Sequence, residues 1–254
     1  MDDAKNGAVA RAFRLMGYVA QGGSTSNLSE LARQAGINRI TASRLLATLE
    51  EEGMLEALPQ GGHRIGVRFL GLAADALGRD DLIGHGRRLV ALLSKQVGWS
   101  GYMVELDGPH VVYLVREVPL TPLVSNIRPG SRLPAYLMAP GRAIMARRPE
   151  STWRAMYDAA QGDVRAGRMS YKELVALLKE ARGQDCVWSF GKFEKGIDAC
   201  AAPVFDAGGE AIAAISAAGP SYHLAEQPSQ KGAIETAVKT TAAQLSQLLG
   251  FVEA

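Results

Sequence analysis

The segment over residues 8–68 constrains the fold most, because three short helical patterns in it are followed by a hairpin pattern. Apolar residues recur at helical spacing over residues 9–20, and a second short helix is expected over residues 27–35. A third helical pattern follows Gly36, with aliphatic residues on one stripe and polar residues on the other side. After Gly53 the period changes to that of strands. Three helices and a hairpin predict a winged helix-turn-helix.

The third helix has a polar side of short hydroxyls and guanidinium groups, although solvation alone would be satisfied by Glu and Lys. In a winged helix-turn-helix this side enters the major groove of DNA, and the hairpin reaches the neighbouring backbone or minor groove. Arg can bind a guanine edge with two hydrogen bonds, and Thr or Ser can contact bases or phosphates. The residues expected to contact DNA are Arg33, Asn38, Arg39, Thr41, Ser43, Arg44 and Arg64.

A hydrated helix face is the simpler interpretation of the same residues, and the three glutamates at 50–52 fit it. The order of the elements favours DNA binding, because a glycine-tipped hairpin with two arginines follows the polar helix. The net charge of the chain is only +2, so binding to nucleic acid has to come from this local patch.

The remainder of the chain predicts a linker and a second domain, and the protein as a whole is expected to be α+β. We expect a winged helix-turn-helix domain over residues 1–70, a linker helix over 71–98 and a second domain over 99–254. Alternating residues from Ser100 onward and an Asp-Gly-Pro turn at 107–109 predict an antiparallel hairpin. Further elements are expected as a short helix ending near residue 147, a helix capped by Ser170 and Glu173, two strands over 197–205 and 211–218, and a last amphipathic helix that includes residues 234–248.

Other features of the composition limit the class of protein. Cys186 and Cys200 form no CxxC pair, which fits a reducing cytosol. No apolar run has the length of a signal peptide or a membrane span, so we expect a cytoplasmic protein without membrane contact. The four histidines are scattered without metal-ligand spacing, and we expect neither a metal nor a cofactor.

Five sequence blocks follow one another in a specific order: ELARQAGINRITASRLLATLEEEGML, GGHRIG, RPGSRLPAYLMAPGRAIMA, EKGIDACAAPVFDAGGE and AAISAAGP. Together they resemble the isocitrate lyase regulator (IclR) family of bacterial transcription factors over about residues 8–250. The resemblance implies a linker helix and a C-terminal GAF-like α/β domain that binds a small-molecule effector. It also implies a homodimer or homotetramer on a palindromic double-stranded DNA operator.

The resemblance further implies where the effector binds, and the chain departs from the family there. In the family block LPxHAxxxGK, backbone amides at a helix N-terminus receive the carboxylate of the effector. Here Tyr136 replaces the His, Arg142 replaces the Lys, and Pro140 has no N–H to donate. One contact to a carboxylate is therefore expected to be lost.

Further departures make the expected pocket more apolar. Phe190 stands where the family often has an acidic residue, and Ala199 stands where it often has a Cys. Cys200 is displaced by one position, toward the opposite face of a strand, and Ser216 is the one serine that remains before Gly-Pro. We expect a partly apolar or aromatic carboxylate as effector, unless these aromatic residues only fill the core. The residues expected to line the pocket are Tyr136, Met138, Ala139, Trp188, Phe190, Phe193, Ala199, Cys200 and Ser216.

The sequence thus predicts a ligand-responsive regulator of a catabolic operon, more readily a repressor than an activator. The alternative from another class is an enzyme, but the chain has no G-x-S-x-G, GxxxxGK or G-x-G-x-x-G motif in the required context. Asp198 and Glu194 form a carboxylate pair of a kind that is common on any surface. A further alternative is an interaction module whose third helix binds a protein instead of DNA.

Overall fold

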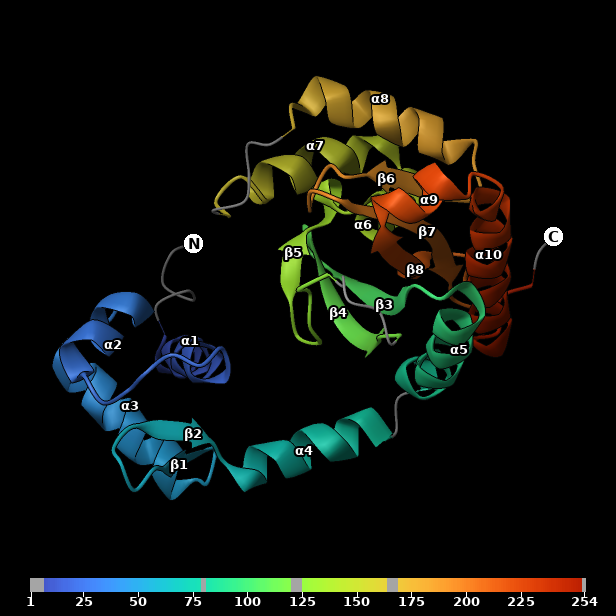
Figure 1. The fold of residues 1–254 in the computed structure, drawn as a ribbon. Helices are drawn as coiled ribbons and strands as arrows, with labels where there is room; N and C mark the ends of the chain where they lie inside the picture. The colour runs from blue at the N-terminus through green and yellow to red at the C-terminus, as the bar shows by residue number, and fades with distance from the viewer. Residues whose placement is uncertain (1–6, 79–80, 120–124, 164–168, 253–254) are drawn as a thin grey trace. The chain divides into compact units, whose positions relative to one another are not determined.

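A computed structural model describes residues 7–78, 81–119, 125–163 and 169–252 (Figure 1). The chain forms two compact units, which cover residues 1–79 and 80–254. The protein is α+β, with short helices and a hairpin in the first unit and an antiparallel sheet between helices in the second. In the described part of the chain, no helix is both long enough and apolar enough to span a membrane.

The N-terminal unit consists of the predicted three helices and hairpin, followed by one more helix. Its elements are α1 (Ala8–Ala20), α2 (Leu28–Ala35), α3 (Arg39–Glu51), β1 (Leu55–Ala57), β2 (His63–Ile65) and α4 (Val67–Gly78). The strands β1 and β2 pair antiparallel. Leu15, Leu31 and Leu55 are almost fully buried and join α1, α2 and the hairpin into one small core.

Local signals account for the ends of these elements. The Asn27 side chain accepts hydrogen bonds from the main-chain N–H groups of Ser29 and Glu30, which satisfies free donors at the start of α2. Gly36 ends α2 with a φ of 64°, a left-handed conformation that favours glycine. Asn38 then caps α3 by accepting from the Thr41 N–H at 2.8 Å.

The C-terminal unit is built on one six-stranded antiparallel sheet with the strand order β5-β4-β3-β8-β7-β6. The strands are β3 (Ser100–Asp107), β4 (His110–Glu117), β5 (Arg132–Pro134), β6 (Val187–Phe190), β7 (Ile197–Phe205) and β8 (Ala211–Pro220). The helices are α5 (Asp81–Val97), η2 (Ala135–Leu137, a 3-10 turn), α6 (Ala139–Arg147), α7 (Glu150–Ala159), α8 (Tyr171–Arg182), α9 (Ser221–Glu226) and α10 (Gln230–Leu248). The predicted capping box of Ser170 and Glu173 is present at the start of α8.

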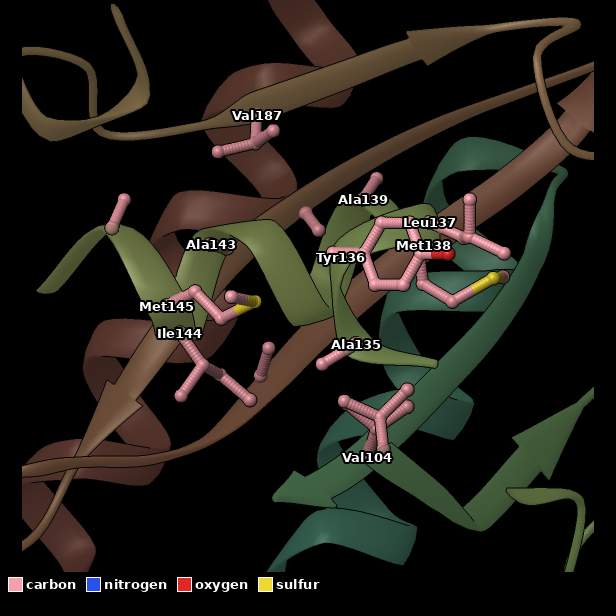
Figure 2. Close-up of a cluster of buried hydrophobic side chains, with 14 of the residues drawn as sticks. Val104, Ala135, Tyr136, Leu137, Met138, Ala139, Ala143, Ile144, Met145 and Val187 are labelled. Carbon is pink, nitrogen blue, oxygen red and sulfur yellow. The ribbon is translucent and has the colours of Figure 1, made fainter. Parts of the chain in front are cut away.

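Each face of the sheet has its own hydrophobic core, because alternate side chains of a strand point to opposite faces. Tyr102 and Val104 belong to the core under α6, whereas Met103 between them belongs to the core under α5 and α10. Figure 2 shows α6 with buried side chains around it, including Val104 from β3 and Val187 from β6. The sheet is therefore the middle layer between two helical layers (Figure 1).

The segment expected as one connecting helix over residues 71–98 contains parts of two helices, α4 and α5. Helix α5 packs directly on the sheet through Leu89, Val90 and other buried residues. A Cβ added at Gly86 would lie 2.3 Å from the Met103 sulfur, so a larger residue there would force the Met103 side chain to move. Much of the predicted linker thus forms part of the C-terminal core.

Candidate functional site

Helix α3 separates its buried and exposed residues cleanly. Ala42, Leu46 and Leu49 are buried in the small core of the N-terminal unit. Arg39, Asn38, Ser43 and Arg44 are exposed, and Thr41 is partly exposed. The Asn38 side chain is occupied by its capping contact, so the remaining polar groups of this set are hydroxyls and guanidinium groups. A helix of this kind can place its polar side in a DNA groove.

Ile40 was not among the residues predicted to contact DNA, yet its side chain is 70% exposed. It shares one side of α3 with Ser43 and Arg44, at spacings of three and four residues. This spacing was readable in the sequence. An exposed aliphatic side chain among groups predicted to contact DNA can contact a thymine methyl group, which polar residues recognise poorly.

Two other arginines predicted to contact DNA are paired with carboxylates inside the N-terminal unit. Arg33 Nε donates to Glu30 at 3.1 Å, and Arg64 Nε donates to Glu56 across the hairpin at 3.1 Å. The hydrogen bonds from Arg33 and Arg64 lower the pKa of Glu30 and of Glu56, respectively. These guanidinium groups would have to be shared between a carboxylate and a phosphate, so they suit contacts to the DNA backbone.

The hairpin is held against the segment that precedes α2. His63 Nδ1 and Thr25 Oγ1 lie 2.8 Å apart, within hydrogen-bonding distance. At the tip, Gly61 and Gly62 have φ values of 89° and 87°, which fits the predicted turn. The tip of the wing is thereby placed beside residues 25 and 26.

The C-terminal unit contains a cavity between the start of α6 and one face of the sheet. The space free of atoms there, counted together with the open solvent at its mouth, is about 450 Å³, and the centre of a water molecule can occupy about 40 Å³ of it. The described residues that line it are Tyr102, Tyr113, Ser125, Ile127, Leu137, Met138, Ala139, Pro140, Ser189, Phe193, Glu194, Ile197, Ala199, Ser216 and Ala218. A wall that is mostly apolar with a few hydroxyl groups is typical of a small-molecule site.

Strand register places the polar groups of this cavity. Tyr102 of β3 lies directly opposite Ser216 of β8, so both side chains are on the same face of the sheet. The rings of Tyr102 and Tyr113 meet edge to face with their centroids 5.5 Å apart. Burial raises the pKa of Tyr113 strongly, with further contributions from Tyr102 and the charge of Glu194, so its phenol stays protonated.

Five of the residues predicted to bind the effector line this cavity, and four do not. The five are Met138, Ala139, Phe193, Ala199 and Ser216. Tyr136 is buried against Tyr157, with ring centroids 5.0 Å apart, and Cys200 lies in the core under α10 next to Cys186.

Trp188 and Phe190 lie in a separate groove. Their rings stack on each other with centroids 5.3 Å apart, and that groove is lined by residues of α8, β6 and α10. Residue type alone did not reveal which aromatic side chains face the cavity. Tyr102 and Tyr113 were missed for the same reason, although the alternation of β3 was recognised.

Arg142 points away from the cavity. Its guanidinium group donates to the main-chain carbonyl oxygens of Leu137 at 3.0 Å and Trp188 at 3.3 Å. Burial lowers its pKa to about 10. Arg142, which replaces the lysine of the family block, therefore makes structural contacts behind the cavity wall. Among the described residues, no cluster of three or more His, Cys, Asp or Glu could hold a metal ion.

Comparison with known proteins gives two family matches that together cover most of the chain. Residues 8–59 match the model described as the IclR helix-turn-helix domain. Residues 74–247 match the model described as bacterial transcriptional regulator IclR C-terminal.

Individual relatives agree with these matches. The transcriptional repressor IclR of Escherichia coli K12 is 26% identical over 224 residues, which are 86% of this chain and 82% of the repressor. The crystal structure of an IclR transcriptional regulator from Alicyclobacillus acidocaldarius has a TM-score of 0.82 at 26% identity and covers 96% of this chain and 98% of its own. An IclR homologue from Microbacterium hydrocarbonoxydans, crystallised with 4-hydroxybenzoate, has a TM-score of 0.80 at 21% identity and covers 96% of this chain and 99% of its own.

Proposed function

The chain belongs to the IclR family of bacterial transcriptional regulators, and on this premise we propose that it binds a palindromic operator as a dimer or tetramer, under the control of a small-molecule effector. Its relatives are DNA-binding regulators and not enzymes. The observation that carries the proposal is the exposed polar side of α3, which Ala42, Leu46 and Leu49 support from within. Such a regulator works where the DNA is, in the cytoplasm.

Repression of a catabolic operon is the mode that we propose. Three relatives carry names that describe repression, the transcriptional repressor IclR, the acetate operon repressor and the DNA-binding transcriptional repressor YiaJ. Activation by the same protein is the alternative. Binding to DNA is common to both modes.

The cavity between α6 and the sheet is the proposed effector site. Its wall is mostly apolar, and its hydroxyl groups can orient a ligand. The resemblance to the family led us to expect a partly apolar or aromatic carboxylate there. The proposed contacts are Met138, Ala139, Phe193, Ala199 and Ser216, to which the structure adds Tyr102 and Tyr113.

Control by the effector requires a difference in affinity between conformations. A ligand that binds two conformations equally shifts neither, however tightly it binds. We therefore propose that the cavity closes more tightly around its ligand in one conformation of the protein. That conformation would bind the operator with a different affinity.

A gel-shift titration of operator fragments at two salt concentrations tests the proposal. Phosphate contacts release counterions, so operator affinity should fall steeply as the salt concentration rises. An excess of unrelated DNA should compete poorly with the operator. Equal binding to all duplexes, or no binding to any, would contradict the proposed function.

A further inference from the structure

The proposed effector cavity contains a negative charge, and its described wall contains no positive charge to balance it. Its polar side chains are the hydroxyls of Tyr102, Tyr113, Ser125, Ser189 and Ser216 and the carboxylate of Glu194. Neither Arg nor Lys occurs among the described lining residues.

Glu194 is close enough to the buried phenol of Tyr113 for its charge to act on that group. It is one of the causes that raise the pKa of Tyr113, after burial and Tyr102. Its Oε1 accepts a hydrogen bond from the Asn126 main-chain N–H at 3.3 Å. The described contacts of this carboxylate leave its other oxygen able to accept a hydrogen from a ligand.

The hydroxyl of Tyr102 is a second polar group in the cavity wall, and a ligand can supply the hydrogen-bond partner that it lacks. Its side chain is 2% exposed and lines the cavity, and its hydroxyl has no hydrogen-bond partner among the described residues. Buried polar groups are nearly always paired, so an unpaired hydroxyl in a cavity wall indicates a missing partner. A hydroxyl group on the ligand can both donate to Glu194 and accept from Tyr102.

The described basic side chains next to the cavity wall do not line the cavity itself. Lys192 and Lys195 flank Glu194 in the sequence and are exposed. Arg116 lies directly opposite Tyr102 in strand register and does not line the cavity. Its Nη2 donates to the Ser125 main-chain carbonyl at 3.0 Å, and its Nε is buried without a hydrogen-bond partner among the described residues. Arg142 donates to main-chain carbonyls behind the wall. At the start of α6, where main-chain amides favour an anion, Pro140 has no N–H. A carboxylate in this cavity would therefore face Glu194 with no cation among the described lining residues.

We infer that the effector is an uncharged aromatic compound bearing a hydroxyl group, a phenol or an aryl alcohol, and that the cavity rejects aromatic carboxylates. Glu194 is the residue that sets this preference, and Tyr102 is its partner in binding the hydroxyl group. The inference rests on the proposed function of the cavity as the effector site. It replaces the carboxylate expected from the family resemblance.

Binding to the full chain is compared for ligands that share a benzene ring and differ in the substituent on it. Benzyl alcohol and phenol are measured against benzoate by thermal shift and by calorimetric titration. The two uncharged compounds should bind with a Kd about tenfold or more below that of benzoate, because the benzoate carboxylate and the Glu194 carboxylate repel each other. Glu194→Gln keeps the size of the side chain and removes its charge. It should therefore reduce the ratio of the benzoate Kd to the benzyl alcohol Kd by about tenfold.

Two further variants separate the role of Glu194 from a general change in the protein. Glu180→Gln makes the same change at an exposed position of α8 outside the cavity, and it should leave the ratio unaltered. Tyr102→Phe should weaken binding of benzyl alcohol without improving that of benzoate. Urea unfolding of each variant shows whether its fold is retained.

Three outcomes would overturn the inference. If benzoate binds more tightly than the alcohols, the ligand class is wrong, while the effector site stands. If Glu194→Gln folds normally and leaves the ratio unchanged, Glu194 does not select the ligand. If no one-ring compound binds, the ligand class is again wrong, and the gel-shift experiment judges DNA binding independently.

Discussion

The buried guanidinium group of Arg142 in α6 donates a hydrogen bond to the main-chain carbonyl oxygen of Trp188 in β6, at 3.3 Å. The same side chain donates to the carbonyl oxygen of Leu137 at 3.0 Å. It therefore joins the edge strand of the sheet to the turn that carries one wall of the cavity. Arg142 is only 1% exposed, so these contacts are shielded from water.

Arg142→Met should destabilise the protein by about 3 kcal/mol, because it leaves buried carbonyl oxygens without donors. Arg142→Lys should cost less, since an ammonium group keeps some of the hydrogen bonds but lacks the planar fork. Urea unfolding measures the free energy of unfolding of both variants. Arg154→Met is the matched control, because Arg154 is exposed and pairs with Asp158 on the surface of α7. Equal losses for Arg142→Met and Arg154→Met would refute the structural role.

Arg44→Ala should reduce operator affinity by roughly 5- to 150-fold, the effect of losing one two-bond contact to a base edge. Effector binding should stay the same, because Arg44 is in the N-terminal unit and the cavity is in the C-terminal unit. A gel shift measures operator affinity, and a thermal shift with ligand measures effector binding. Arg154→Ala serves as the control for a lost surface charge. A parallel loss in both assays for Arg44→Ala would indicate misfolding and not a lost base contact.

Ser216→Ala should weaken effector binding and leave operator binding unchanged, which is the opposite of the result expected for Arg44→Ala. Its hydroxyl lines the cavity opposite Tyr102, so its loss should weaken binding of the effector by about fivefold, the value of one hydrogen bond. Operator affinity without ligand should not change. Ser94→Ala is a comparison within the same unit, because Ser94 is buried and donates to the Trp99 carbonyl oxygen away from the cavity. Unaltered ligand binding in Ser216→Ala would exclude this hydroxyl from the site.

His110 should make the C-terminal unit less stable in mild acid. Burial, followed by the charge of Arg132, lowers its pKa below the ordinary value of 6.5, against the opposing effect of Asp163 and Asp107. The unfolded chain then binds a proton more readily than the folded chain, so the free energy of unfolding falls as the pH drops below 6.5 toward the lowered pKa. Above 6.5 this contribution is fully retained.

Urea unfolding of the wild type and His110→Gln between pH 7.5 and 5.5 checks this expectation. The variant cannot take up a proton at this position, so its stability should fall less over the same interval. The two carboxylates and Arg132 remain in both proteins, so their effects largely cancel in the comparison. A steeper fall in the variant than in the wild type would contradict a lowered pKa for His110.

Local chemistry explains why the N-terminal unit could be predicted well. Caps and glycines act within a few residues, and Asn27, Gly36 and Gly62 mark the same boundaries in the sequence and in the structure. Elements without such signals were missed, notably β6 and α7. Strand β6 is only four residues long, and α7 begins after Pro149 without a side-chain cap.

The cavity could be predicted only in part, because its walls come from strands that are distant in the sequence. The start of α6 was identified through its family motif, and Met138 and Ala139 do line the cavity. Glu194 and Tyr102 were not assigned to it, since neither motif nor spacing connects residues that are brought together only by the pairing of β3, β8 and β7. Trp188 and Phe190 were assigned to it by residue type and lie in another groove.

The sequence by itself determined the family, the order of helices and strands and the polar side of α3, since each depends on residues close together in the chain. Only the tertiary structure decided which face of each strand meets which helical layer. Tyr102 and Met103 are neighbours in the sequence, yet one lines a cavity under α6 and the other is packed under α5. The physical reason is that alternation defines two faces of a strand, while long-range packing assigns each face its partner.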